Sequence, residues 1–238
     1  MSRNRLFLLL LHLVALPAFA EDKESSEYED ASEYEEEEAK NPSLEGSRRF
    51  SLQTGWRYTP NTRFFDNFYA RQENRGLTRA GGALGGPLLA GTFAYSPQNW
   101  LEVGFDLFFT YERMQLTKKP GLNAITFGAI LGLRLQRRLE LGSKEFIPFV
   151  GALVGPTFAG AYFDGGQSVE NFAHAFGATA GGTLRLSSKW GLCVEYRLTY
   201  AKGQAERLGT YDAGGSWLAV GLTYVFPTAQ DRPLSRNF

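Results

Sequence analysis

Residues 190–200 read WGLCVEYRLTY, and this stretch decides the fold of the chain. Every second side chain in it is large and apolar: Trp190, Leu192, Val194, Tyr196, Leu198 and Tyr200. The side chains between them are small or polar: Gly191, Cys193, Glu195, Arg197 and Thr199. Because successive side chains of a β-strand point to opposite faces, the stretch predicts a strand with one apolar and one polar face.

Seven further stretches have strand-like sequence, and the alternation is clearest at 101–112 and 216–226. We expect eight strands, at 49–59, 84–95, 101–112, 123–137, 146–162, 173–186, 190–200 and 216–226. Short polar turns alternate with longer connections. The turns are 96–99, 139–145 and 187–189, and the connections include 60–82 and 202–214. In the fifth strand Pro148 and Pro156 cannot donate ladder hydrogen bonds, so we expect a bulge or kink there.

The polar face of these strands is rich in Gly, Ala and Thr and carries few charges. A soluble barrel turns its apolar residues inward and would present many more Lys and Glu residues to water. Small residues suit the lumen of a narrow barrel, whereas large apolar residues suit contact with lipid. The pattern therefore predicts an all-β fold, an eight-stranded antiparallel up-and-down transmembrane β-barrel. A soluble periplasmic, lipocalin-like barrel that binds a small apolar ligand is the alternative.

The first 20 residues have the features of a cleavable export signal. Arg3 and Arg5 precede an apolar run at 6–16, and small residues stand before the expected cut after Ala20. This run is too short to span a membrane as a helix. Residues 21–40 then contain eleven acidic residues and two lysines, a net charge of −9. Such a composition predicts disorder.

These features divide the chain into four parts. We expect a signal peptide at 1–20, an acidic disordered periplasmic segment at 21–46, the barrel at 47–226 and a polar tail at 227–238. An even number of strands places both ends of the barrel in the periplasm.

The strand pattern resembles the small eight-stranded outer-membrane barrels, the group of the OmpA barrel, OmpX, OmpW and the porin-family β-barrel domain. The resemblance covers about 49–226 and rests on the strand count, on PFVGALVG at 148–155 and on GLTYVF at 221–226. It implies insertion into the lipid bilayer of a Gram-negative outer membrane, with the barrel-assembly machinery as a partner. Such proteins usually end at the aromatic residue that this machinery recognises. Here a polar tail follows Phe226, so Phe226 and Phe238 are both candidates.

Charged residues on the predicted inner face suggest ion pairs within the lumen. They are Glu102, Asp106, Glu112, Arg134, Arg138, Arg185, Glu195 and Arg197. On neighbouring strands Glu102 lies near Arg134 or Arg138, and Arg185 is expected to face Glu195 and Arg197. These residues form either a polar path or gate, or an internal network that fills a barrel too narrow to conduct well. We favour the internal network.

Aromatic residues collect at the strand ends next to the short turns. Trp100, Trp190, Tyr224 and Phe226 are expected to form the periplasmic aromatic girdle.

The first long connection interleaves arginines with aromatic residues, and the arginines are Arg63, Arg71, Arg75 and Arg79. Because guanidinium groups match phosphate geometry, this loop is a candidate for contact with lipopolysaccharide or another ligand. The alternative is that the loop folds over the barrel mouth.

Residues for catalysis or metal binding are scarce. Cys193 is the single cysteine, and His174 is the single histidine after residue 20. Lipid A deacylases of this architecture place a His and a Ser two residues apart, but here Phe176 stands in the place of the serine. We therefore expect no enzyme activity, no metal, no cofactor and no nucleic-acid partner. The predicted role is that of a monomeric structural or porin-like barrel, and the alternative is a surface-binding protein or adhesin.

Overall fold

The computed structural model describes residues 43–59, 66, 69–72, 75–76, 85–114, 122–142, 144–163, 169–205 and 209–226. Eight long strands build the barrel: β1 (Arg48–Tyr58), β2 (Gly86–Gln98), β3 (Leu101–Met114), β4 (Leu122–Gln136), β6 (Lys144–Phe163), β7 (Val169–Arg185), β8 (Trp190–Tyr200) and β11 (Gly215–Phe226). Three short strands accompany them: β5 (Leu139–Leu141), β9 (Lys202–Ala205) and β10 (Gly209–Asp212). In the described part of the chain, no helix is long and apolar enough to cross a membrane.

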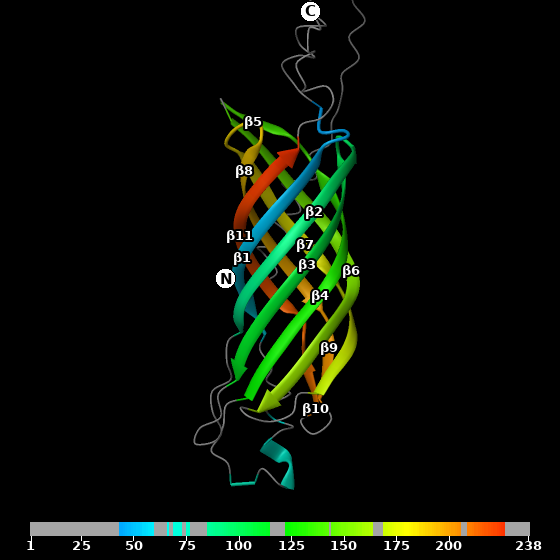
Figure 1. Ribbon diagram of the computed structural model, residues 1–238, viewed down its shortest axis with the longest axis vertical. Coiled ribbons are helices and arrows are strands. Elements are labelled where there is room, and N and C mark those ends of the chain that lie inside the picture. The colour runs from blue at the N-terminus through cyan, green and yellow to red at the C-terminus, as the bar shows by residue number, and fades with distance from the viewer. Residues whose placement is uncertain are drawn as a thin grey trace, which may run out of the picture. The chain divides into compact units, whose positions relative to one another are not determined.

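The eight long strands form one closed antiparallel sheet (Figure 1). Its order is β4-β3-β2-β1-β11-β8-β7-β6, and pairing between β4 and β6 closes the ring. Arg48 at the start of β1 lies opposite Phe226 at the end of β11, so the barrel begins and ends at the same side. We call this side, which also carries the short β2–β3 and β7–β8 connections, the turn end, and the opposite side the loop end. The predicted eight-stranded antiparallel barrel is confirmed.

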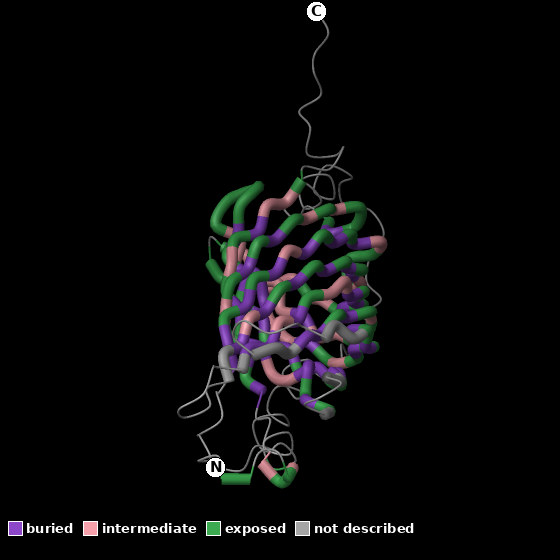
Figure 2. Tube along the Cα trace, turned by 60° about the horizontal axis from the view of Figure 1, so that its bottom comes forward, coloured by how far each residue is buried: buried purple, intermediate pink, exposed green. Residues whose placement is uncertain are grey.

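Side chains alternate between the lumen and the outer surface along the strands (Figure 2). In β8 every residue of the apolar series is exposed and every residue between them is buried. Outward-facing Leu131, Phe176 and Leu218 are 56–58% exposed, whereas Asp106 and Arg134 are fully buried. A continuous apolar outer face around a charged interior is stable in lipid and not in water. The barrel is thus a transmembrane barrel, and the lipocalin-like alternative, which required the opposite orientation, is wrong.

Bulky side chains pack inside the barrel. Phe108 on β3 and Trp217 on β11 meet with ring centroids 4.7 Å apart. Leu88, Ile130 and Leu153 are buried beside them. The lumen of an eight-stranded barrel is just wide enough for side chains to fill it, and these residues do so.

Of the bulge or kink expected in the fifth strand, the bulge is not present, although the ladder with β4 is interrupted at Gly155 and Pro156. β6 pairs with β7 from Glu145 to Ala161 without a change of register. On the other side, the ladder with β4 has the same register before and after Pro156. The prolines are therefore accommodated without an inserted residue. The register shift lies instead between β2 and β3, at Tyr95 and Gln98.

A short segment before β1 is attached to the turn end. The Asn99 side-chain oxygen accepts hydrogen bonds from Ser43 Oγ and from the backbone N–H groups of Leu44 and Glu45, at 2.7, 2.7 and 3.1 Å. Leu44 is buried. The segment from Ser43 therefore belongs to the same compact unit as the barrel. The predicted signal peptide, most of the acidic segment and the polar tail lie outside the described residues.

Candidate functional site

A compact group of charged side chains crosses the lumen. It consists of three arginines and three acidic residues, Arg49, Arg134, Arg197, Glu102, Asp106 and Glu195, which we call the central ion-pair network. The residues stand at inward-facing positions of β1, β3, β4 and β8. Glu102 and Arg134 are direct cross-strand partners, which places their side chains side by side on the lumen face.

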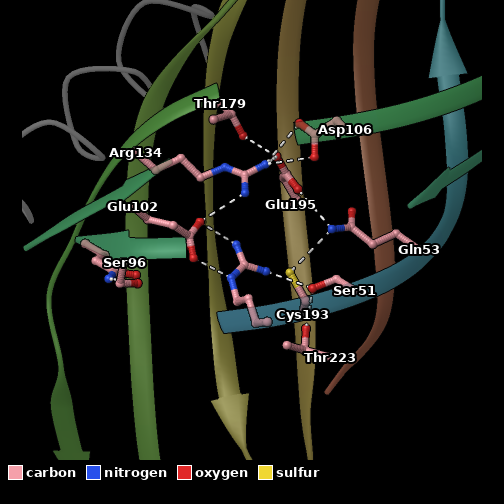
Figure 3. Close-up of polar contacts among 12 residues, drawn as sticks. Ser51, Gln53, Ser96, Glu102, Asp106, Arg134, Thr179, Cys193, Glu195 and Thr223 are labelled. Carbon is pink, nitrogen blue, oxygen red and sulfur yellow. Dashed lines mark hydrogen bonds and ion pairs between the residues drawn. The ribbon is translucent and has the colours of Figure 1, made fainter. Parts of the chain in front are cut away.

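Arg134 is the centre of the network (Figure 3). Its Nη1 lies 3.1 Å from Glu102 Oε1, and its Nη2 lies 3.2 Å from Asp106 Oδ2 and 3.3 Å from Glu195 Oε1. The guanidinium carbon also lies 5.2 Å from the ring centroid of Phe149. One buried guanidinium thus joins strands on opposite sides of the barrel.

The two other arginines complete the network. Arg49 Nε and Nη2 donate to the two carboxylate oxygens of Glu102 at 2.5 and 2.6 Å. Arg197 Nε donates to Glu195 Oε1 at 2.7 Å, and its Nη1 lies 3.0 Å from Asp106 Oδ2. Three positive and three negative charges therefore balance. Such balance is required, because a buried charge without a partner costs several kcal/mol.

Neutral side chains satisfy the remaining acceptor capacity of Glu195. Thr179 Oγ1 donates to Glu195 Oε1 at 2.6 Å, and Gln53 Nε2 donates to Oε2 at 3.0 Å. Gln53 also lies 3.7 Å from the sulfur of the buried Cys193. These bonds hold the carboxylate in one orientation, which favours a fixed network over mobile charges.

A second buried ion pair lies nearer the loop end. Arg57 Nε donates to Glu112 Oε1 at 2.9 Å, and Thr59 Oγ1 donates to the same oxygen at 2.5 Å. Arg57 Nη1 donates to the backbone oxygen of Ala213, at 2.5 Å. This pair ties β1 to the segment that leads from the β9–β10 hairpin into β11. Glu112 is therefore buried in the lumen as expected, but its ion pair is with Arg57.

Arg138 and Arg185 lie at the turn end, away from the central network. Both pair with Glu145, and Arg185 Nη1 lies 3.2 Å from Glu145 Oε2. Their side chains are 15% and 16% exposed. The expectation that Arg185 faces Glu195 and Arg197 is wrong, because in the β7–β8 ladder Arg185 stands opposite Gly191.

Four charged or amide participants were missing from the sequence prediction, Arg49, Gln53, Arg57 and Glu145, and so were the hydroxyl donors Thr59 and Thr179. The first three share one phase of β1 with Ser51, and the buried Thr59 continues this phase directly after the strand. An alternating polar face was therefore present in the sequence of this strand and would have identified them. Glu145 stands beside the β5–β6 turn, where periodicity gives no such signal.

The four predicted girdle residues lie at the turn end. The Trp190 and Tyr224 rings are 5.0 Å apart, and the Tyr224 and Phe226 rings are 5.2 Å apart. Trp100, in the turn between β2 and β3, is 55% exposed.

The structure describes two of the four loop arginines, Arg71 and Arg75. Arg63 and Arg79 lie outside the described residues, Arg71 is half-buried and Arg75 is exposed. In the same loop, Tyr69 packs against the buried cluster that contains Phe108 and Trp217. Part of this loop thus contacts the barrel interior at its mouth.

The remaining reactive side chains stand apart from one another. His174 is exposed on β7, and its ring packs edge-on against Phe172 at 4.9 Å. Cys193 is buried in the lumen. Among the residues that the structure describes, no group of three or more His, Cys, Asp or Glu side chains is arranged to hold a metal ion.

No protein-family model matches the chain, and no curated protein matches its sequence. Solved structures do match. Neisserial surface protein A is 16% identical, with a TM-score of 0.52 over 76% of this chain and 100% of that chain. The outer membrane protein OprG from Pseudomonas aeruginosa is 12% identical, with a TM-score of 0.46 over 77% and 97%. The outer membrane protein AlkL is 17% identical, with a TM-score of 0.41 over 87% and 98%.

The match to Neisserial surface protein A spans the whole of that protein and shows a shared fold. The resemblance to small eight-stranded outer-membrane barrels, which the sequence suggested, is confirmed at the level of the fold.

Proposed function

We propose that this chain, which has the fold of the small eight-stranded outer-membrane barrels, is an outer-membrane protein with a structural or porin-like role and no catalytic activity. The export signal predicted at 1–20 and the apolar outer face of the barrel support this location. In this role the barrel passes small solutes slowly at most.

The observation that carries the proposal is the filled lumen. The central ion-pair network crosses the barrel at the level of Arg134, and the Phe108–Trp217 ring pair lies next to it on the side of the loop end. Arg197 joins the two layers, because its guanidinium carbon lies 5.3 Å from the ring centroid of Trp217. A solute would have to displace both a balanced charge cluster and two large rings.

Recordings from single channels in planar lipid bilayers test this role. We expect the wild-type protein to show no steady open level. A Phe108→Ala/Trp217→Ala variant should open several-fold more often, because it removes one of the two layers. The matched control is Phe109→Ala/Leu218→Ala, which removes the lipid-facing neighbours of the same two residues and should stay silent.

Folding of each variant is checked by the shift in gel mobility on boiling, which a closed barrel shows. Steady openings of the wild type at high conductance would contradict a filled lumen. Silence of the ring-pair variant in a folded barrel would show that the rings do not contribute to closure.

Binding at the outer surface is the competing role, and the filled lumen is compatible with it. Tyr69 contacts the buried cluster and so positions part of the loop that carries Arg71 and Arg75 at the barrel mouth. Replacing Arg63, Arg71, Arg75 and Arg79 by Ser should lower lipopolysaccharide binding at least tenfold if this loop makes the contact, because charge-assisted bonds to phosphate contribute about 1.5–3 kcal/mol each. Unchanged binding would exclude the loop as the contact site.

A further inference from the structure

A ladder of three aromatic side chains crosses the outer surface at the turn end, from β8 to the end of β11. It consists of Trp190, Tyr224 and Phe226, whose neighbouring rings lie 5.0 and 5.2 Å apart. Trp190 is 50% exposed and Phe226 is 40% exposed. Aromatic side chains at this level of a transmembrane barrel lie among the lipid headgroups.

A cation stands at each side of this ladder. Arg48 is the first residue of β1 and lies directly opposite Phe226. Lys189 precedes Trp190, and its backbone oxygen accepts a hydrogen bond from Val225 N at 2.7 Å. β11 therefore runs between the two cations, which puts their backbones about two strand spacings, or about 10 Å, apart.

Neither cation is neutralised by the described part of the protein. Both side chains are exposed, and neither forms an ion pair with a described residue. Arg138 and Arg185, also near this end, differ from them, because both share the carboxylate of Glu145. Arg48 and Lys189 thus carry unpaired positive charge at the edge of the apolar band.

Arg48 also has the position that a headgroup contact requires. It stands on the same outward-facing side of β1 as Phe50 and Leu52, which are 44% and 53% exposed. On its other side it lies opposite Tyr95 of β2, which is 43% exposed. The aliphatic stem of an arginine at such a site lies on apolar surface while the guanidinium reaches the polar region.

We propose that Arg48, Lys189 and the aromatic ladder between them bind an anionic phospholipid of the leaflet at the turn end. The two cations hold the phosphate of the headgroup, and the rings of Tyr224 and Phe226 contact the glycerol and the first methylenes. The aromatic ladder is the reason to assign a lipid rather than a soluble anion. A soluble anion would gain nothing from contact with an exposed apolar surface. The proposal rests on the membrane location proposed above.

The barrel itself offers a matched control for the test. Arg137 and Lys144 are exposed at the same end and form no ion pair with a described residue. Arg137 directly follows β4 and Lys144 begins β6, and these strands lie across the ring from β11. The variants Arg48→Gln/Lys189→Gln and Arg137→Gln/Lys144→Gln therefore remove the same charge from the same end.

Native mass spectrometry of the full chain measures how strongly phosphatidylglycerol is retained relative to phosphatidylethanolamine. We expect the wild type to prefer phosphatidylglycerol. Arg48→Gln/Lys189→Gln should lower this preference about tenfold or more, since each cation near a lipid surface contributes about 1 kcal/mol, or about fivefold. Arg137→Gln/Lys144→Gln should change the preference less than about twofold.

Equal losses in the two variants would overturn the proposal in favour of a diffuse basic rim, and a wild type without preference would overturn it outright. A variant that lacks residues 21–40 removes the chain's own excess of acidic residues and is expected to keep the preference. A preference that is present only in that variant would also overturn the proposal for the full chain. The lipid measurement does not depend on conductance, so an open pore would contradict the proposed function and leave this site intact.

Discussion

Replacing Arg134 by Met should lower the free energy of unfolding by about 3–5 kcal/mol, because it leaves a buried carboxylate without its compensating charge. Arg134 contacts Glu102, Asp106 and Glu195 and is fully buried. Methionine fills a similar volume, so the loss reports mainly the uncompensated charge and not a cavity. Urea titration of the protein refolded into phospholipid vesicles, followed by tryptophan fluorescence, measures the effect.

A compensated double variant separates charge from packing. In Arg134→Met/Asp106→Asn the central network keeps two complete pairs, Arg49 with Glu102 and Arg197 with Glu195. We expect this variant to recover at least half of the stability lost in Arg134→Met. A double variant as unstable as the single one would mean that the methionine disturbs packing and would refute the charge explanation.

The free energy of unfolding lost on removal of an arginine should depend on where in the barrel the arginine lies. Arg185 pairs with Glu145, but both side chains are partly exposed at the turn end. The variant Arg185→Met should therefore cost about 1 kcal/mol or less. A loss as large as that of Arg134→Met would show that burial is not what distinguishes the two arginines.

Replacing Trp217 by Ala should also cost about 3–5 kcal/mol, the usual range for removal of a buried tryptophan. Trp217 is 2% exposed, and its ring contacts Phe108 and the guanidinium of Arg197. The substitution leaves a cavity that β11 and its neighbours cannot close, because the strands are fixed by the ladder hydrogen bonds of the closed sheet. The same urea titration measures the loss.

The next residue along β11 is the control. Leu218 points to the lipid side and is 57% exposed. Because lipid chains fill the space that its side chain leaves, Leu218→Ala loses only transfer free energy, about 1–2 kcal/mol. Equal losses at the two positions would contradict the assignment of the lumen and lipid faces of β11.

The sequence was sufficient for the barrel because each strand carries its own signal. The alternation of 190–200 depends on residues next to one another in the chain, and so does the preference for small residues on the inner face. For the same reason the contact between Glu102 and Arg134 was among the expected ones, since it joins neighbouring strands.

Contacts across the lumen could not be predicted in this way. Arg49 reaches Glu102 past β2, and Arg134 on β4 reaches Glu195 on β8 across the barrel. Which inward-facing side chains lie at the same height in the lumen depends on the strand number, tilt and stagger of the closed barrel. The bulge expected as one possibility at the prolines is absent, because a missing ladder hydrogen bond does not by itself require an inserted residue.

The central network draws its members from four strands, and Arg49 and Arg197 stand 148 positions apart in the chain. The charges are nevertheless balanced within each part: Arg49 and Arg134 of β1 and β4 balance Glu102 and Asp106 of β3, and Glu195 and Arg197 of β8 balance each other. Neither part of the chain therefore carries a net buried charge toward the hydrocarbon interior before the barrel closes, a charge that would cost several kcal/mol. Closure of the barrel adds only the contacts across the lumen, of Arg134 with Glu195 and of Arg197 with Asp106, so it locks a network whose halves are already neutral.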